Sequence, residues 1–198
     1  MSVALYVEGG GDRREQKARL RRGLRGFLEK AGLQGRMPRI VACGGRDKAY
    51  DQFTLVHANE TTSAMLLVDA EGPVTASSAW QHLRQREGWD CPAGATDEHC
   101  HLMVQVMESW FLADLKALAG FYGASFRPGS IPKWPDIEQV RKEDVYAKLK
   151  EATRNTTKGD YHKGRDSSVI LGQLDPNKVA DESPHAKRLI DTLKKLSA

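Results

Sequence analysis

Four acidic residues could together hold a metal ion, because each stands at the end of a predicted strand or just past it: Glu8, Asp69, Glu71 and Glu108. The strands are predicted from short apolar runs at residues 3–7, 64–68 and 102–107. In an open parallel sheet the carboxyl ends of the strands share one edge. We therefore expect the four carboxylates to converge there, although any one acid taken alone is better explained as an exposed turn residue.

Converging carboxylates repel one another, and a hard divalent cation with oxygen ligands removes that conflict. Mg²⁺ or Mn²⁺ bound in this way suits attack on a phosphodiester, because the metal polarises the phosphoryl oxygen and stabilises charge on the leaving oxygen. The acidic positions therefore predict a site for Mg²⁺ (or Mn²⁺) that supports phosphoryl transfer.

Basic residues gather in the N-terminal part of the chain. Between Asp12 and Arg46 there are eleven Lys and Arg residues against three Asp and Glu, while the whole chain has a net charge of only +4. One stripe of a predicted helix in this segment is basic: Arg14, Lys17, Arg21 and Arg25. Such a stripe is typical of a nucleic-acid contact, and it is equally typical of a solvated helix face.

Three further basic residues are candidates for binding a substrate phosphate: Lys163, Arg165 and His185. Cations near a metal site often bind phosphate oxygens, and the alternative is an exposed basic loop. The three glycines at 9–11 lack the spacing of a P-loop or a dinucleotide-binding loop. We interpret them as giving flexible access to Glu8.

The elements that must position these residues alternate along the first part of the chain. Four strand-then-helix units are predicted up to Gly120, with Asp12 as the cap of the first helix. This alternation predicts an α/β fold with a mainly parallel four-stranded sheet covered by helices.

Beyond Gly120 prolines interrupt the chain. Helices are predicted over residues 137–154, over 167–171 with an extension, and over 184–196. Ser183 is expected to cap the last of these, with a proline at the first helical position. We therefore predict an α/β core at residues 1–120 and a helical extension at 121–198, packed together as one compact domain.

Composition excludes several classes of protein. Of the 198 residues 40% are hydrophobic and 28% are charged, which is ordinary for a globular protein and unlike a disordered chain. No apolar run approaches the ~18 residues of a membrane span, and Glu8 follows the first apolar residues too soon for a signal peptide. Three cysteines fit a reducing compartment. We therefore expect a cytoplasmic protein without a membrane partner.

Two motifs resemble the Toprim domain, which topoisomerases, DnaG-type primases, OLD-family nucleases and RecR-type recombination mediators share. They read Val7-Glu8-Gly9 after the first apolar run and Asp69-Ala70-Glu71-Gly72 after a later one. The resemblance implies a Toprim-like (Rossmann-like) form of the α/β fold. It also implies that Glu8 is the general acid/base and that the acidic pair binds Mg²⁺. The second acid of that pair is a glutamate instead of the usual aspartate, which keeps the ligand type and adds one methylene.

A longer motif is similar to one Toprim-like bacterial family, the domain-of-unknown-function 4276 family. It reads Val106-Met107-Glu108-Ser109-Trp110-Phe111-Leu112-Ala113-Asp114, with Ser183-Pro184-His185 near the end of the chain. Members of that family often neighbour SMC-like or AAA-type ATPases in phage-defence loci. The resemblance spans nearly the whole chain.

Together these features predict a Toprim-type, Mg²⁺-dependent nuclease acting on nucleic acid, in phage defence or DNA repair with an ATPase partner. In this interpretation Glu8 is the general acid/base and Asp69 and Glu71 are metal ligands. Glu108 is a third ligand or an orienting group, and the basic stripe binds the nucleic-acid backbone. The alternative is a non-catalytic Toprim-fold module that docks on an ATPase or on nucleic acid.

Overall fold

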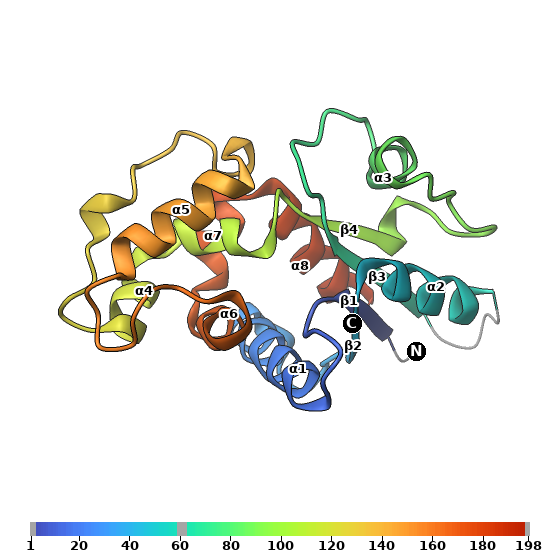
Figure 1. The fold of residues 1–198 in the computed structure, drawn as a ribbon. Coiled ribbons are helices and arrows are strands. Elements are labelled where there is room, and N and C mark those ends of the chain that lie inside the picture. The colour runs from blue at the N-terminus through green and yellow to red at the C-terminus, as the bar shows by residue number, and fades with distance from the viewer. Residues whose placement is uncertain (1–2, 59–62, 197–198) are drawn as a thin grey trace.

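The computed structural model describes residues 3–58 and 63–196. At its centre is a sheet of four parallel strands in the spatial order β2-β1-β3-β4. The strands are β1 (Val3–Glu8), β2 (Arg39–Gly44), β3 (Ser63–Asp69) and β4 (Cys100–Met103). Helices cover both faces of this sheet (Figure 1). The predicted α/β fold with a parallel, helix-covered sheet is therefore confirmed.

Burial on both faces explains why the strands read as continuous apolar runs. Leu5 of β1 and Leu67 of β3 belong to the core on one face of the sheet, whereas Tyr6 and Leu66 belong to the core on the other. None of these four side chains is more than 3% exposed. Because successive residues of a strand point to opposite faces, a strand covered on both sides needs apolar residues at every position.

The described residues form eight α-helices around the sheet. They are α1 (Arg14–Leu28), α2 (Arg46–His57), α3 (Ala79–Glu87), α4 (Leu115–Tyr122), α5 (Lys142–Thr153), α6 (Lys163–Gln173), α7 (Pro176–Glu182) and α8 (Pro184–Leu196). Helices α2 and α3 build the core on one face, and α1 builds the core on the other face together with α4 to α8. Across residues 3–58 and 63–196, no helix combines the length and the apolar character of a membrane span.

The largest differences from the predicted boundaries come after β3. The fourth strand is Cys100–Met103 and not residues 102–107, because the N–H of Met107 donates to the Asp69 side chain instead of to a neighbouring strand. A 3₁₀ segment, Met107–Ala113, follows β4, and α4 begins only at Leu115. Helix α7 is separate from α6, since Pro176 opens it and Asp175 caps it.

The predicted cap of the first helix is wrong. Helix α1 begins after Arg13 and has no side-chain cap. The exposed carboxylate of Asp12 lies 2.7 Å from Nζ of Lys48 in α2 instead. The predicted cap of α8 is present, because Oγ of Ser183 accepts the N–H of Ala186 at 3.1 Å.

Candidate metal-binding site

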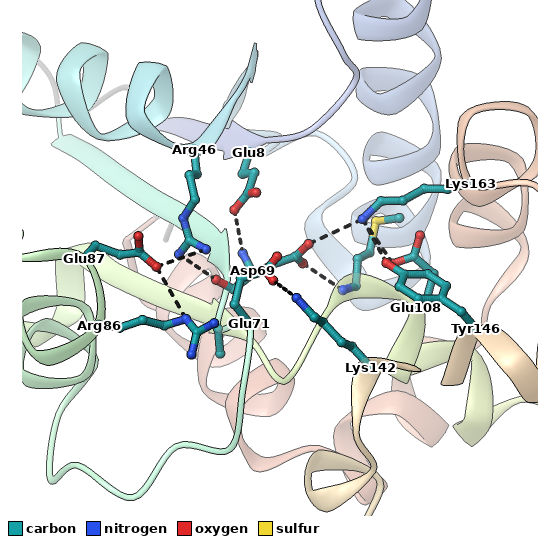
Figure 2. Close-up of polar contacts among 12 residues, drawn as sticks. Glu8, Arg46, Asp69, Glu71, Arg86, Glu87, Glu108, Lys142, Tyr146 and Lys163 are labelled. Atoms are coloured by element: carbon teal, nitrogen blue, oxygen red, sulfur yellow. Dashed lines mark hydrogen bonds and ion pairs between the residues drawn. The ribbon is translucent and has the colours of Figure 1, made fainter. Parts of the chain in front are cut away.

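Three of the four predicted acidic residues meet at the carboxyl edge of the sheet (Figure 2). Glu8 ends β1, Asp69 ends β3, and Glu71 lies in the loop after β3. One carboxylate oxygen of each residue lies within 4.8 Å of the other two. Asp69 is only 4% exposed, whereas Glu8 and Glu71 are half-buried. Three convergent carboxylate oxygens suit the hard ions Mg²⁺ and Mn²⁺, and we call these residues the acidic group.

Backbone hydrogen bonds fix the directions of these side chains. The N–H of Asp69 donates to Oε2 of Glu8 at 3.0 Å, which ties the ends of two neighbouring strands together. The N–H of Met107 donates to Oδ1 of Asp69 at 2.8 Å. Glu71 has a φ of 62°, and its N–H donates to the carbonyl of Gln105 at 2.7 Å. Non-glycine residues seldom adopt this left-handed conformation, and such residues cluster at functional sites.

Three cations of the chain lie against the acidic group, and each is the first residue of a helix. Nζ of Lys142 in α5 lies 2.5 Å from Oε2 of Glu71. Nζ of Lys163 in α6 lies 3.6 Å from Oδ2 of Asp69. Arg46 in α2 donates to the carbonyl oxygen of Asp69 at 3.1 Å. Figure 2 shows these side chains pointing toward the carboxylates from three sides.

Burial and these cations act on the acids in opposite directions. Burial raises the pKa of Asp69 well above its ordinary value, against the charge of Lys163, which lowers it. Burial also raises the pKa of Glu8. At Glu71 burial acts the same way, but the hydrogen bond and charge of Lys142 outweigh it, so the pKa of Glu71 is lowered. A divalent cation at this place would favour the ionised form of all three carboxyls.

Glu108 is fully buried and lies beside the acidic group, not within it. Its Oε1 accepts a hydrogen bond from the hydroxyl of Tyr161 at 2.7 Å, and its Oε2 accepts one from Tyr146 at 3.2 Å. Nζ of Lys163 is 3.6 Å from Oε2 of Glu108 and also 3.6 Å from Oδ2 of Asp69. Lys163 therefore links Glu108 to the acidic group, and a role for Glu108 as a metal ligand stays a prediction.

A cleft of about 290 Å³ opens beside the acidic group. One wall is formed by Glu8 and the three glycines after it, and the other by Lys163 and Gly164 at the start of α6. Gly9 exchanges two backbone hydrogen bonds with Gly44, of 2.7 and 3.0 Å. Gly9 is thus tied to the end of β2, and flexible access to Glu8 through the glycines stays a prediction. Two members of the acidic group, Glu8 and Asp69, therefore line the same cleft as the cation Lys163.

Among the three candidate phosphate-binding residues, Lys163 is the one whose side chain reaches the acidic group. Arg165 donates to both carboxylate oxygens of its neighbour Asp166, at 2.6 and 2.8 Å. Nδ1 of His185 lies 2.7 Å from Oε2 of Glu138. These two side chains are engaged by other carboxylates, so of the three candidates Lys163 is the one in place to contact a group bound at the acidic edge.

The predicted basic stripe lies on α1, whose first turn follows the glycine loop of the cleft. The side chains of Arg14 and Arg25 are exposed, and those of Lys17 and Arg21 are half-buried. The stripe therefore runs away from the cleft along the helix, in a position that a bound polyanion could follow.

Sequence reasoning missed two of the cations at the acidic group, Arg46 and Lys142. Arg46 comes two residues after the last residue of β2, so the strand-end argument used for the acids could have found it. Lys142 comes from the segment after the proline-rich loop. No spacing or periodicity in the sequence relates it to the sheet.

The chain matches the model of one protein family, described as "Domain of unknown function (DUF4276)", over residues 7–194. The matched segment includes the whole acidic group, the cleft and the helices that line it. No curated protein and no solved structure matches the chain.

Proposed function

The chain belongs to the DUF4276 family, and we propose that it is a cytoplasmic, metal-dependent nuclease of the Toprim type. The observation that carries this proposal is the acidic group, in which three carboxylate oxygens lie within 4.8 Å of one another beside an open cleft. Asp69 and Glu71 would hold Mg²⁺ or Mn²⁺. Glu108 would be a third ligand or would orient the others through Lys163.

The reaction is hydrolysis of a phosphodiester. When bound, the metal would polarise the phosphoryl oxygen and stabilise charge on the leaving oxygen. Water oxygen bonds to phosphorus, the P–O ester bond breaks, and the leaving oxygen takes up a proton. Glu8 borders the cleft and burial raises the pKa of its carboxyl, which suits a residue that takes a proton from water and delivers one to the leaving group. Lys163 would bind a non-bridging phosphate oxygen.

The substrate would be held by the basic stripe of α1, defined above, through contacts with the phosphate backbone that do not depend on sequence. The resemblance to a family whose members often neighbour SMC-like or AAA-type ATPases in phage-defence loci supports an ATPase partner, in phage defence or DNA repair. Neither the kind of nucleic acid nor the partner enters the chemistry at the acidic group, which is the same for DNA and RNA.

The ion pairs of the acidic group favour one alternative, a module that binds without catalysis. Lys142 and Lys163 balance Glu71 and Asp69 from distances of 2.5 and 3.6 Å without any metal. In this alternative the acidic edge is a salt-bridge network that stabilises the fold. The fold itself would dock on an ATPase or on nucleic acid.

Nicking of a supercoiled plasmid in Mn²⁺ or Mg²⁺ separates the two functions. Wild-type protein is expected to nick the plasmid, and Glu8→Gln is expected to lose roughly 100-fold or more, because positioned acid–base catalysis contributes that much. Asp69→Asn is expected to lose activity and, unlike Glu8→Gln, to bind Mn²⁺ more weakly in a calorimetric titration.

Asp12→Asn is the matched control, because Asp12 is an exposed acid next to the glycine loop whose partner is Lys48 and not a member of the acidic group. It is expected to retain wild-type nicking. If wild type and Glu8→Gln nick equally, Glu8 is not the general acid/base of the reaction. No nicking by wild type with either metal would leave the non-catalytic module as the function.

A further inference from the structure

An arginine of α3 lies just outside the acidic group. It is Arg86, in the last turn of that helix. A Cβ atom at Gly72, the residue after Glu71, would lie 3.3 Å from Nη1 of Arg86. Because glycine has no side chain, the guanidinium can lie against the chain next to Glu71. Figure 2 shows Arg86 and Lys163 on opposite sides of the acidic group.

The guanidinium of Arg86 keeps donors that the protein does not use. Its Nε lies 3.4 Å from Oε1 of Glu87, and the Arg86 side chain is 41% exposed. Within residues 3–58 and 63–196, none of its nitrogens donates a hydrogen bond. Arg165 differs, because it donates to both carboxylate oxygens of Asp166. Arg86 is therefore able to bind a ligand where Arg165 is not.

Glu87 has a second cation as its partner. The same oxygen, Oε1, lies 3.3 Å from Nη1 of Arg46. Arg46 is the more buried of the two arginines, with 17% of its side chain exposed, and it also donates to the carbonyl oxygen of Asp69. One carboxylate thus faces two guanidiniums, so one positive charge stays unbalanced at this place. An anion beside the exposed guanidinium of Arg86 would balance it.

The position of Arg86 in its helix does not explain this arrangement. A cation in the last turn interacts favourably with the negative end of the helix dipole, and Arg84 of the same turn has that advantage too. Nε of Arg84 lies 3.4 Å from Oδ1 of Asp90, and both side chains are exposed. Of the two arginines, Arg86 is the one whose guanidinium lies against Gly72.

The ligand that fits this place is a phosphate of a nucleic-acid strand. A guanidinium offers two parallel N–H donors that match two oxygens of a phosphate. Lys163, on the other side of the acidic group, is in place to contact the phosphate that reacts. A strand of a B-form duplex carries one phosphate per ~3.4 Å of helix axis, so cations on two sides of one site can bind successive phosphates.

We propose that Arg86 binds the phosphate next to the one that is cleaved, so that the substrate strand crosses the acidic group between Lys163 of α6 and Arg86 of α3. This inference rests on the proposed function for the identity of the cleaved phosphate. The contact itself requires no turnover, and a substrate with a single phosphate cannot make it.

Fluorescence anisotropy in EDTA with a labelled DNA duplex of about 20 base pairs measures this contact without turnover. R86Q is expected to raise Kd about tenfold at low salt. The slope of log Kd against log salt is expected to fall by about 1, the value for one phosphate contact. R86K keeps the charge, so it is expected to keep the slope and to lose part of the affinity, because an ammonium does not bind two oxygens in parallel.

R84Q is the matched control, since Arg84 is in the same turn of α3 and has Asp90 as its partner. Its Kd and slope are expected to equal those of wild type. R86Q is expected to melt like wild type, because Glu87 keeps Arg46 as a partner. Equal slopes for R86Q and R84Q would overturn the proposal. If R86Q melts lower than R84Q, R86K decides, and a wild-type Kd for R86K would overturn the proposal as well.

Substrates with one phosphate and with several distinguish this proposal from the proposed function. They are bis(p-nitrophenyl) phosphate and a single-stranded oligonucleotide. The ratio of the oligonucleotide KM to the KM of the small ester is expected to rise about tenfold in R86Q and to keep its wild-type value in R84Q. Binding that depends on Arg86, without cleavage by any form, would overturn the nuclease and leave the contact. Cleavage with the wild-type ratio in R86Q would overturn the contact alone.

Discussion

Glu71 has two competing partners in the proposed mechanism. In the structure its Oε2 lies 2.5 Å from Nζ of Lys142, with side-chain exposures of 23% for Glu71 and 34% for Lys142. A divalent cation at the acidic group must compete with this ammonium for the same carboxylate, and it is also repelled by the ammonium charge. Lys142 is therefore expected to weaken metal binding while it stabilises the metal-free protein.

Lys142→Gln is accordingly expected to tighten Mn²⁺ binding, by roughly tenfold, which is ~1.4 kcal/mol of binding free energy. Isothermal titration calorimetry on metal-free protein measures this change. In the absence of metal the variant is expected to melt at a lower temperature than wild type, because Glu71 loses its ion-pair partner in a half-buried place.

Lys148→Gln is the control for this comparison. Lys148 lies on the same helix, pairs with Glu151 at 2.8 Å with side-chain exposures of 36% and 44%, and does not contact the acidic group. Its Mn²⁺ affinity is expected to match wild type. If Lys142→Gln binds Mn²⁺ no more tightly than Lys148→Gln, Glu71 is not a metal ligand.

At this scale the sequence was informative where topology alone decides which residues meet. The proximity of Glu8 and Asp69 could be predicted from the sequence, because parallel strands end at the same edge of the sheet whatever the rest of the fold does. Glu108 was expected there too, but the chain leaves the sheet at Met103 and buries Glu108 against two tyrosines. Lys142 follows a loop whose path depends on tertiary packing, and no local pattern encodes that path.

At the scale of elements, the cleft depends on how closely α6 approaches α1. A Cβ atom at Gly23 of α1 would overlap the carbonyl oxygen of Ser168 in α6, and Gly172 packs against the backbone of Gly23. Glycine at these positions lets the two helix backbones touch. The contact sets the position of α6, and with it that of Lys163, its first residue, on the wall of the cleft.

Gly23→Ala is expected to lower the free energy of unfolding by roughly 1–3 kcal/mol, because the methyl group overlaps backbone that has no room to move. The loss is a net value, because the overlap outweighs the ~1 kcal/mol of stability that alanine gains over glycine inside a helix. Gly26→Ala is the control, since its Cβ would lie 3.4 Å from the nearest atom, the carbonyl oxygen of Gly172. It is expected to leave stability unchanged or to raise it by up to ~1 kcal/mol. Urea denaturation measures both, and equal losses would show that close packing of α1 on α6 does not matter.

The two predicted helix caps show how far local sequence determines an element. Ser183 caps α8 as expected, because Pro184 favours an extended backbone at Ser183, the conformation that a helix-capping serine adopts. Asp12 follows three glycines with φ values of 114°, 81° and 56°. That backbone turns its carboxylate toward Lys48 of α2, a partner that is distant in sequence and could not be predicted from the capping pattern.

At the scale of the whole molecule, negative charge gathers at the ends of two strands and positive charge gathers on α1. The acidic group and its cations lie at the carboxyl edge of the sheet, and the basic stripe lies on α1. The sequence predicted a basic N-terminal segment but placed its contacts on one helix stripe. Arg39 of β2 is basic too, but its guanidinium donates to the hydroxyl of Tyr6, whose side chain lies on the face of the sheet opposite α1.

Mg²⁺ is expected to raise the melting temperature of the protein, because an ion that binds the folded acidic group and not the unfolded chain adds its binding free energy to stability. At about 100 times Kd the gain is ~2.7 kcal/mol, roughly 5–10 °C for a domain of this size. Asp69→Asn is expected to melt no lower than wild type in metal-free buffer, since it removes a buried charge and retains an oxygen for the N–H of Met107. In Mg²⁺ its melting temperature is expected to rise less than that of wild type. Asp12→Asn is expected to shift as wild type does. Melting curves at constant ionic strength measure all three, and an equal shift in every protein, or none in wild type, would mean that the acidic group does not bind the metal.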